Sequence, residues 1–129
     1  MILVDTSAWI EFFRGHDPVA HRVAELLECN EAALCGPILT ELRRGFRSAR
    51  DRDRVLPLLE ACHQLAQPAG LWEDAGDVGF ALGRKGFSVK TLDLLIATYA
   101  LGYSVALLTT DRDFLLIQKA GFPLALAPK

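Results

Sequence analysis

The chain has 129 residues, a formal net charge of −2, 51% hydrophobic residues and 23% charged residues. This length suits one hydrophobic core, and we predict a single domain spanning residues 1–129. The composition excludes a disordered or low-complexity protein. The charge excludes a protein that binds polyanions through its overall positive charge, so any contact with nucleic acid requires a local concentration of basic residues.

The start of the chain and its cysteines favour a cytoplasmic protein. The first residues, MILVDTSAW, lack the basic region, long apolar core and cleavage site of a signal peptide. The three cysteines contain no C-x-x-C pair, which argues against a disulfide framework and a structural zinc site. An uncharged run over residues 94–110 is interrupted by Gly102 and Ser104, so a helix, a turn and a buried strand explain it better than a membrane span. We expect no membrane contact.

Short aliphatic runs predict strands that are buried on both faces, because they do not alternate apolar with polar residues. The two clearest runs are ILV at residues 2–4 and VALLT at 105–109. Weaker strand candidates lie at residues 32–35, 63–66 and 123–127.

Helical patterns separate these runs. Asp17-Pro18 predicts one helix start, because a capping side chain precedes a proline at the first helical position. A second helix is expected to begin at Pro37 and to turn Ile38, Leu42 and Phe46 toward the core. A third pattern begins at Leu92, and Gly102 is placed to end it. The alternation of strands and helices predicts an α/β sandwich around a mostly parallel sheet.

Four acidic residues are expected at the carboxyl edge of this sheet, where α/β folds form ligand sites. Asp5 directly follows the first strand, and Asp111 follows VALLTT. Glu41 lies about one turn into the helix after residues 32–35. Asp93 lies in the first turn of the helix that leads to the strand before Asp111. The chain order therefore predicts that distant carboxylates converge.

Each acid also has a structural interpretation. Asp5 and Asp111 could cap helix N-termini, and Asp93 could favour a helix start electrostatically. Glu41 could pair with a neighbouring arginine on a solvated surface. The expected convergence of these residues at one edge of the sheet favours a catalytic site over these structural roles.

Converging carboxylates repel one another unless a cation neutralises them. Ligation by carboxylate oxygens alone suits Mg²⁺ or Mn²⁺. Such an ion activates water and stabilises charge on an attacked phosphate, so the pattern indicates phosphoryl-transfer chemistry. Hydroxyl groups beside the acids could orient a carboxylate or bond to strand ends: Thr6, Ser7, Thr109 and Thr110. Asp113 is either an additional acid of the site or a residue favoured in a first helical turn.

The basic residues concentrate in RRGFRSARDRDR, residues 43–54. Arginine binds phosphate through two hydrogen bonds, which makes this segment a candidate RNA-binding surface. Interleaved Asp51 and Asp53 are equally consistent with a solvated surface of ion pairs. The candidate RNA contacts are Arg43, Arg44, Arg47 and Arg50. Nearby aromatic residues either stack on bases or pack in the core: Trp9, Phe12, Phe13 and Phe46.

Taken together, these segments resemble the PIN domain, and most closely the VapC-type toxins of toxin-antitoxin pairs. The resemblance rests on ILVDTSAWIEFFRG, TELRRG, TLDLLIATYALG and LLTTDRDF, which occur in the order and spacing of the four acidic motifs of PIN domains. It implies a Rossmann-like three-layer sandwich and Mg²⁺- or Mn²⁺-dependent endoribonuclease activity. It also implies a homodimer and a cognate VapB-type antitoxin.

By the same resemblance, Asp5, Glu41, Asp93 and Asp111 are expected to bind the metal or orient its ligands. Asp113 matches an acid that varies within the family. Two other functions remain open. One is a PIN-like protein-interaction module with little turnover. The other is a phosphatase with an aspartyl nucleophile, although the acid pair of that family follows the first strand and this first strand is followed by Asp5 alone.

Overall fold

The computed structural model describes all 129 residues and contains one four-stranded sheet. Its strands are β1 (Ile2–Val4), β2 (Ala32–Leu34), β3 (His63–Gln64) and β4 (Ala106–Leu108). They are ordered β3-β2-β1-β4, and every pair is parallel. The predicted α/β fold with a parallel sheet is therefore confirmed.

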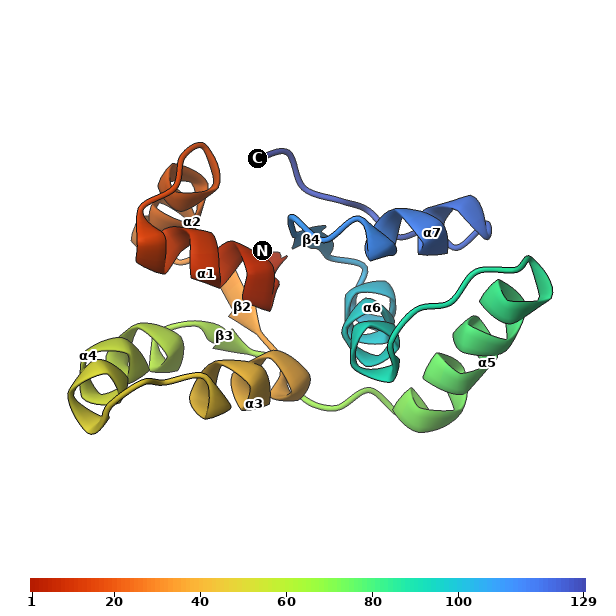
Figure 1. Ribbon diagram of the computed structural model, residues 1–129, viewed down its shortest axis with the longest axis horizontal. Helices are drawn as coiled ribbons and strands as arrows, with labels where there is room; N and C mark the ends of the chain where they lie inside the picture. Colours follow the sequence, from red (N-terminus) through yellow and green to blue (C-terminus); the bar gives the residue numbers. More distant parts are fainter.

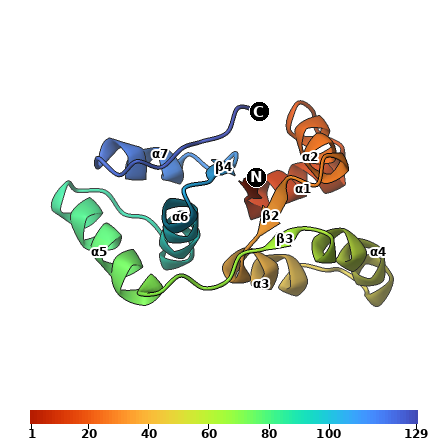
Figure 2. The same ribbon diagram turned by 180° about the vertical axis from the view of Figure 1, so that it is seen from behind.

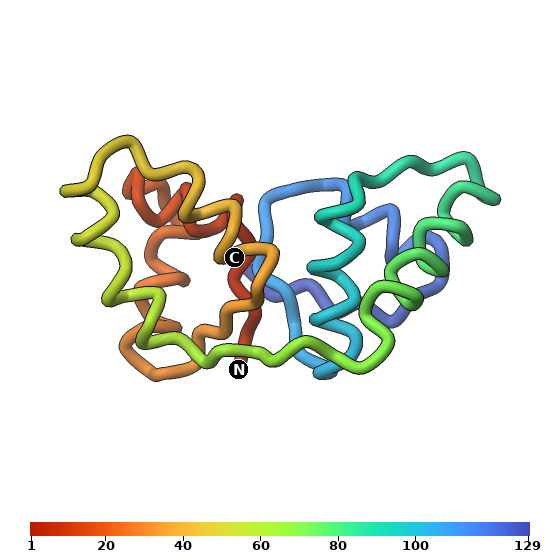
Figure 3. Tube along the Cα trace, turned by 90° about the horizontal axis from the view of Figure 1, so that it is seen from below, coloured from red at the N-terminus to blue at the C-terminus, as the bar shows by residue number.

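Seven helices connect the strands and flank the sheet on both sides. Helices α1–α4 lie on one side of the sheet and α5–α7 on the other (Figures 1 and 3). Figure 2 shows the same arrangement from behind, with α5–α7 on the left. The helices are α1 (Thr6–Arg14), α2 (Val19–Glu28), α3 (Gly36–Arg44), α4 (Ala49–Glu60), α5 (Leu71–Arg84), α6 (Thr91–Tyr103) and α7 (Asp113–Lys119).

Strands β1 and β4 are apolar because both of their faces are covered. Leu3 and Val4 of β1 and Leu107 and Leu108 of β4 have no exposed surface. They belong to a core cluster of 32 buried residues that also contains much of α6. Residues 93–100 of α6 are all buried, which explains why this helix has an almost uninterrupted apolar sequence and not an amphipathic one.

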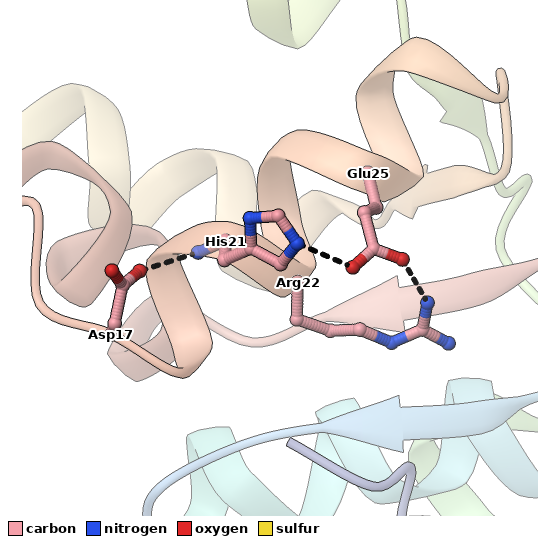
Figure 4. Close-up of polar contacts among 4 residues, drawn as sticks. All are labelled: Asp17, His21, Arg22 and Glu25. Atoms are coloured by element: carbon pink, nitrogen blue, oxygen red, sulfur yellow. Dashed lines mark hydrogen bonds and ion pairs between the residues drawn. The ribbon is translucent and has the colours of Figure 1, made fainter.

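Helix α2 begins at Val19, one residue later than predicted, with Pro18 at the N-cap position, although Asp17 still bonds to its first turn. Figure 4 shows the Asp17 carboxylate accepting a hydrogen bond of 3.1 Å from the backbone N–H of His21. Pro18 has α-helical dihedral angles, and its carbonyl accepts a hydrogen bond from Arg22. Farther along, Glu25 lies within 3.0 Å of His21 and 3.5 Å of Arg22 (Figure 4). These exposed pairs support a solvated helix face and contribute little stability.

Three further details of the predicted elements differ from the structure. Phe46 lies beyond the end of α3, although it packs against the core as predicted, and Ile38 and Leu42 are buried as predicted. Helix α6 continues through Gly102 to Tyr103, and its C-cap residue Ser104 adopts the left-handed conformation (φ 53°). Residues 123–127 form a single bridge, between Leu126 and Leu107, in place of a strand. Prolines on both sides, at 123 and 128, limit the backbone N–H groups available to extend it.

Two further observations concern the cysteines and the helices. All three cysteines are free. None of the helices combines the length and the apolar composition that crossing a bilayer requires.

Candidate active site

The ends of β1 and β4 lie side by side, and this pairing brings the first and last acidic motifs together. Val4 pairs with Leu108 in the parallel register. The backbone N–H of Asp5 donates to the carbonyl of Leu108 at 2.9 Å. The segment Thr109–Asp111 leaves the sheet at the same edge, so residues more than one hundred positions apart become neighbours.

Two hydroxyl groups fix the side chain of Asp5, which is only 4% exposed. Its Oδ2 accepts hydrogen bonds from Ser7 Oγ (2.7 Å) and Thr109 Oγ1 (2.8 Å). Asp5 occupies the N-cap position of α1, yet its carboxylate makes no capping hydrogen bond to that helix. Burial raises the pKa of Asp5, and the hydrogen bonds from Ser7 and Thr109 oppose that rise. The carboxylate is thus held in one orientation by this chain alone.

The same two hydroxyls also hold the loop that carries Asp111. Thr109 Oγ1 accepts from the backbone N–H of Asp111 at 3.0 Å, and Ser7 Oγ accepts from that of Thr110 at 3.0 Å. The two hydroxyl oxygens lie 3.1 Å apart, but each has a single proton that is already donated to Asp5. Ser7 and Thr109 therefore couple the position of Asp5 to that of the loop after β4.

Glu41 is anchored to α1 and not to the arginines beside it. Its Oε1 accepts a 2.8 Å hydrogen bond from Thr6 Oγ1, across 35 positions of the chain. The ion pairs of the structure include neither Arg43 nor Arg44. Thr6 directly follows Asp5, so this bond places Glu41 beside the same sheet edge.

Three further carboxylates approach one another closely. Oxygen atoms of Asp93, Asp111 and Asp113 all lie within 4.8 Å of each other. Asp111 Oδ1 accepts a hydrogen bond from the backbone N–H of Asp113 at 2.9 Å, so the capping interpretation holds for that one oxygen. No lysine, arginine or histidine forms an ion pair with any of the three.

The electrostatics of Asp93 show that all the acids share one region. Burial, and to a lesser extent the charges of four other carboxylates, together raise the pKa of Asp93 from 3.8 to about 6. Those carboxylates belong to Asp111, Asp5, Glu41 and Asp113. Since Coulomb interactions fall off with distance, their joint effect on one side chain requires the predicted convergence.

Cys35, the only thiol near these acids, is not a nucleophile. It lies at the N-cap of α3 and is 2% exposed. Burial, together with the charges of Asp5 and Glu41, raises the pKa of this thiol to about 12. A protonated thiol neither attacks a phosphate nor binds a metal well.

The donor set fits a hard divalent cation. It consists of carboxylate oxygens, the ligands that Mg²⁺ and Mn²⁺ prefer. The group Asp93, Asp111 and Asp113 is close enough to share one ion and lacks a cationic side chain to neutralise it. Asp5 and Glu41 lie outside this closest group.

The remaining predicted site residues lie in different parts of the structure. The backbone N–H of Thr110 helps to hold the loop, but its exposed side chain makes no hydrogen bond. Arg47 lines a pocket that includes Thr6 and Glu41. Arg43 lines a different pocket between α3 and α4, and Arg50 lies at the start of α4 beside Ser48. Arg44 is exposed and lines none of these pockets.

The four aromatic residues considered for base stacking differ in their burial. Trp9 is completely buried, and Phe12 packs against the core. Phe13 is 40% exposed, and both Phe13 and Phe46 line the pocket beside Glu41. Arg14 lines the same pocket and was not among the predicted residues. Its position directly after two phenylalanines in EFFRG was the available signal.

Residues 2–120 match the PIN domain family. The chain belongs to this family. Among curated proteins it is similar to Ribonuclease VapC21 of Mycobacterium tuberculosis, with 37% identity over 119 residues, which cover 87% of this chain and 82% of that protein. It is also similar to Ribonuclease VapC11 of the same species, with 30% identity over 119 residues, 88% of this chain and 89% of that protein.

Solved structures support the same fold. VapBC2 from Rickettsia felis, bound to a DNA fragment from its promoter, has a chain that superposes with a TM-score of 0.77 at 20% identity, covering 98% of both chains. VapBC-1 from nontypeable Haemophilus influenzae has one with a TM-score of 0.77 at 24% identity, covering 98% of this chain and 97% of that one. At these identities the likeness establishes the fold alone.

Proposed function

We propose that this chain is a ribonuclease of the VapC type, an endoribonuclease that depends on Mg²⁺ or Mn²⁺ and acts as the toxin of a toxin-antitoxin pair. The observation that carries the proposal is the group of Asp93, Asp111 and Asp113, whose oxygens lie within 4.8 Å with no neutralising side chain. The VapC ribonucleases that match most of the chain support RNA as the substrate.

Each acid has a proposed role in hydrolysis. Asp5, Asp93 and Asp111 would hold the cation, and Asp113 adds a carboxylate to the group of Asp93 and Asp111. A divalent cation held there would supply activation of a water molecule and neutralisation of charge on the phosphate. Glu41, fixed by Thr6, orients the attacking water and accepts its proton. Ser7 and Thr109 keep Asp5 in place, so that little reorganisation is needed when RNA binds.

The biological setting is proposed on the same basis. Residues 1–129 form one domain that works in the cytoplasm as a homodimer, and a cognate VapB-type antitoxin inhibits it. Solved structures with this fold include a toxin-antitoxin complex from Klebsiella pneumoniae and VapBC-5 from Mycobacterium tuberculosis, a member of the VapBC family of toxin-antitoxin systems. They support a protein partner for this chain.

The direct test is cleavage of a labelled single-stranded RNA in Mn²⁺ by the purified protein. We expect cleavage by the wild type, none in EDTA, and a loss of at least about 100-fold in Asp5→Asn, because even the outer partners of metal sites are worth about 10- to 100-fold. Asp77→Asn is the matched control, since Asp77 is an exposed acid on α5. Equal cleavage by the wild type and Asp5→Asn would remove the support for a nuclease and favour a binding module.

A further inference from the structure

A pocket of about 400 Å³ opens beside Glu41, between α1, α3 and the start of α4. Thr6 and Glu41 form its boundary with the acidic site, and they are joined by a hydrogen bond. A molecule in this pocket therefore lies beside Glu41, the acid proposed to orient the attacking water.

One wall of the pocket is aromatic and rigid. Phe13 is 40% exposed, and it stacks on the fully buried Trp9 with ring centroids 5.9 Å apart and an interplanar angle of 30°. Phe12 lies against both rings. Because Trp9 and Phe12 support Phe13 from the core, the ring is held in place while part of its surface faces the pocket. Phe46, just after α3, contributes a second ring.

The pocket is also lined by arginine side chains, some of which form no ion pair. Three arginines line it, of which Arg54 is engaged by Asp51 at 3.3 Å. Arg14 and Arg47 form no ion pair. Two guanidinium groups without ion pairs, beside the exposed ring of Phe13 and the partly buried ring of Phe46, are suited to an anion with a flat apolar part.

We propose that this pocket binds an unpaired nucleobase of the RNA, one nucleotide away from the phosphate that is cleaved. The base stacks on Phe13 or Phe46, and Arg14 and Arg47 bind the phosphates on either side of it. An apolar peptide would use the rings but would leave the two guanidinium groups without partners. The inference rests on the proposed ribonuclease function and makes the pocket a determinant of substrate choice.

Binding is measured in an Asp93→Asn background with EDTA, so that the RNA stays intact. The probes are a fluorescein-labelled single-stranded RNA decamer and, as competitor, inorganic polyphosphate of similar charge that lacks bases. We expect Phe13→Leu and Phe46→Leu to weaken RNA binding about fivefold or more while leaving polyphosphate binding unchanged. Arg47→Ala is expected to weaken both and to reduce the salt dependence by about one phosphate contact.

Matched controls separate the pocket from general effects. Phe80 on α5 is 70% exposed, so Phe80→Leu removes an aromatic ring that is outside the pocket. Arg43 is on the same helix as Glu41 but lines another pocket, so Arg43→Ala changes the charge equally with a smaller expected loss. Phe13→Tyr keeps the ring and should keep the RNA affinity, which guards against loss through misfolding.

Unchanged RNA affinity in both phenylalanine variants overturns the inference, whatever else the pocket then holds. Equal loss of RNA and polyphosphate in those variants also overturns it, because bases are then not what the rings recognise. Failure of the ribonuclease proposal is distinguishable: it appears as absence of Asp5-dependent cleavage in Mn²⁺, whereas failure of the pocket leaves cleavage intact and removes only the dependence on Phe13 and Phe46.

Discussion

Asp5 and the group of Asp93, Asp111 and Asp113 lie at the same sheet edge, but their surroundings differ. Asp5 accepts two hydrogen bonds from hydroxyl groups through one oxygen. The other three carboxylates lie within 4.8 Å of each other, and a single backbone N–H is the only donor to any of them. The protein therefore stabilises the Asp5 carboxylate with its own hydrogen-bond donors. The carboxylates of Asp93, Asp111 and Asp113 have almost no such donors and need a cation or a proton from solution.

This difference distinguishes a carboxylate that the protein itself positions, that of Asp5, from carboxylates that are suited to binding a cation. Hydroxyl donors fix a carboxylate without removing its charge, so Asp5 is oriented before any ligand arrives. The group around Asp93 needs a proton or a cation, as the raised pKa of Asp93 indicates. Substitutions in the two regions should therefore have different consequences for cleavage, cation binding and stability.

The largest expected effect comes from Asp93. Asp93→Asn removes a negative charge from the uncompensated group, and we expect it to reduce RNA cleavage in Mn²⁺ at least about 100-fold. Ser7→Ala should reduce cleavage only about tenfold, because Thr109 still donates to Asp5. Initial rates on a labelled RNA measure both. Equal losses would show that orientation of Asp5 matters as much as the cation.

The next effect is stabilisation by the cation. At free Mn²⁺ about 100 times its Kd, binding to the folded state alone stabilises the wild type by about 2.7 kcal/mol. Thermal unfolding with and without Mn²⁺ should show this gain in the wild type and in Ser7→Ala. The gain should be absent from Asp93→Asn, and a similar rise in Tm in that variant would place the cation elsewhere.

A smaller effect is expected at the hydroxyl that joins the two regions. Thr109→Val keeps the side-chain shape but removes a donor to Asp5 and an acceptor for Asp111. We expect a loss of about 1.5 to 2 kcal/mol in the free energy of unfolding, because a buried charged acceptor loses a partner. Urea unfolding measures it. Thr110→Val is the control, since the Thr110 side chain makes no hydrogen bond, and it should change stability little.

A further effect is a pH dependence that is seen only without divalent cation. The pKa of Asp93 is about 6 in the folded protein and 3.8 ordinarily, so the folded state holds the proton more tightly. Stability should therefore rise as the pH falls from about 6 toward 3.8, and be lowest above 6, where the carboxyl is ionised in both states. Thermal unfolding in EDTA should show this rise in the wild type and in Asp77→Asn, and less of it in Asp93→Asn.

Much of the fold was predictable from local patterns. The runs at residues 2–4 and 105–109 are apolar because both faces of these strands are covered, and the structure has strands at Ile2–Val4 and Ala106–Leu108. The errors lie where local signals are weak. Gly102 is a common helix terminator, yet α6 continues through Tyr103 and it is Ser104 that adopts the left-handed conformation. Residues 123–127 have strand-like composition, but proline at position 123 lacks a backbone donor.

The sequence by itself determined which residue types stand at the ends of the parallel strands, because strand direction and apolar patterning are local properties of the chain. That is why the convergence of Asp5, Asp93 and Asp111 could be anticipated. Only the tertiary structure decided their partners. Thr6 bonds to Glu41 across 35 positions, and Thr109 bonds to Asp5 across 104. Such contacts depend on strand order and register to within an ångström or so, and no local pattern encodes them.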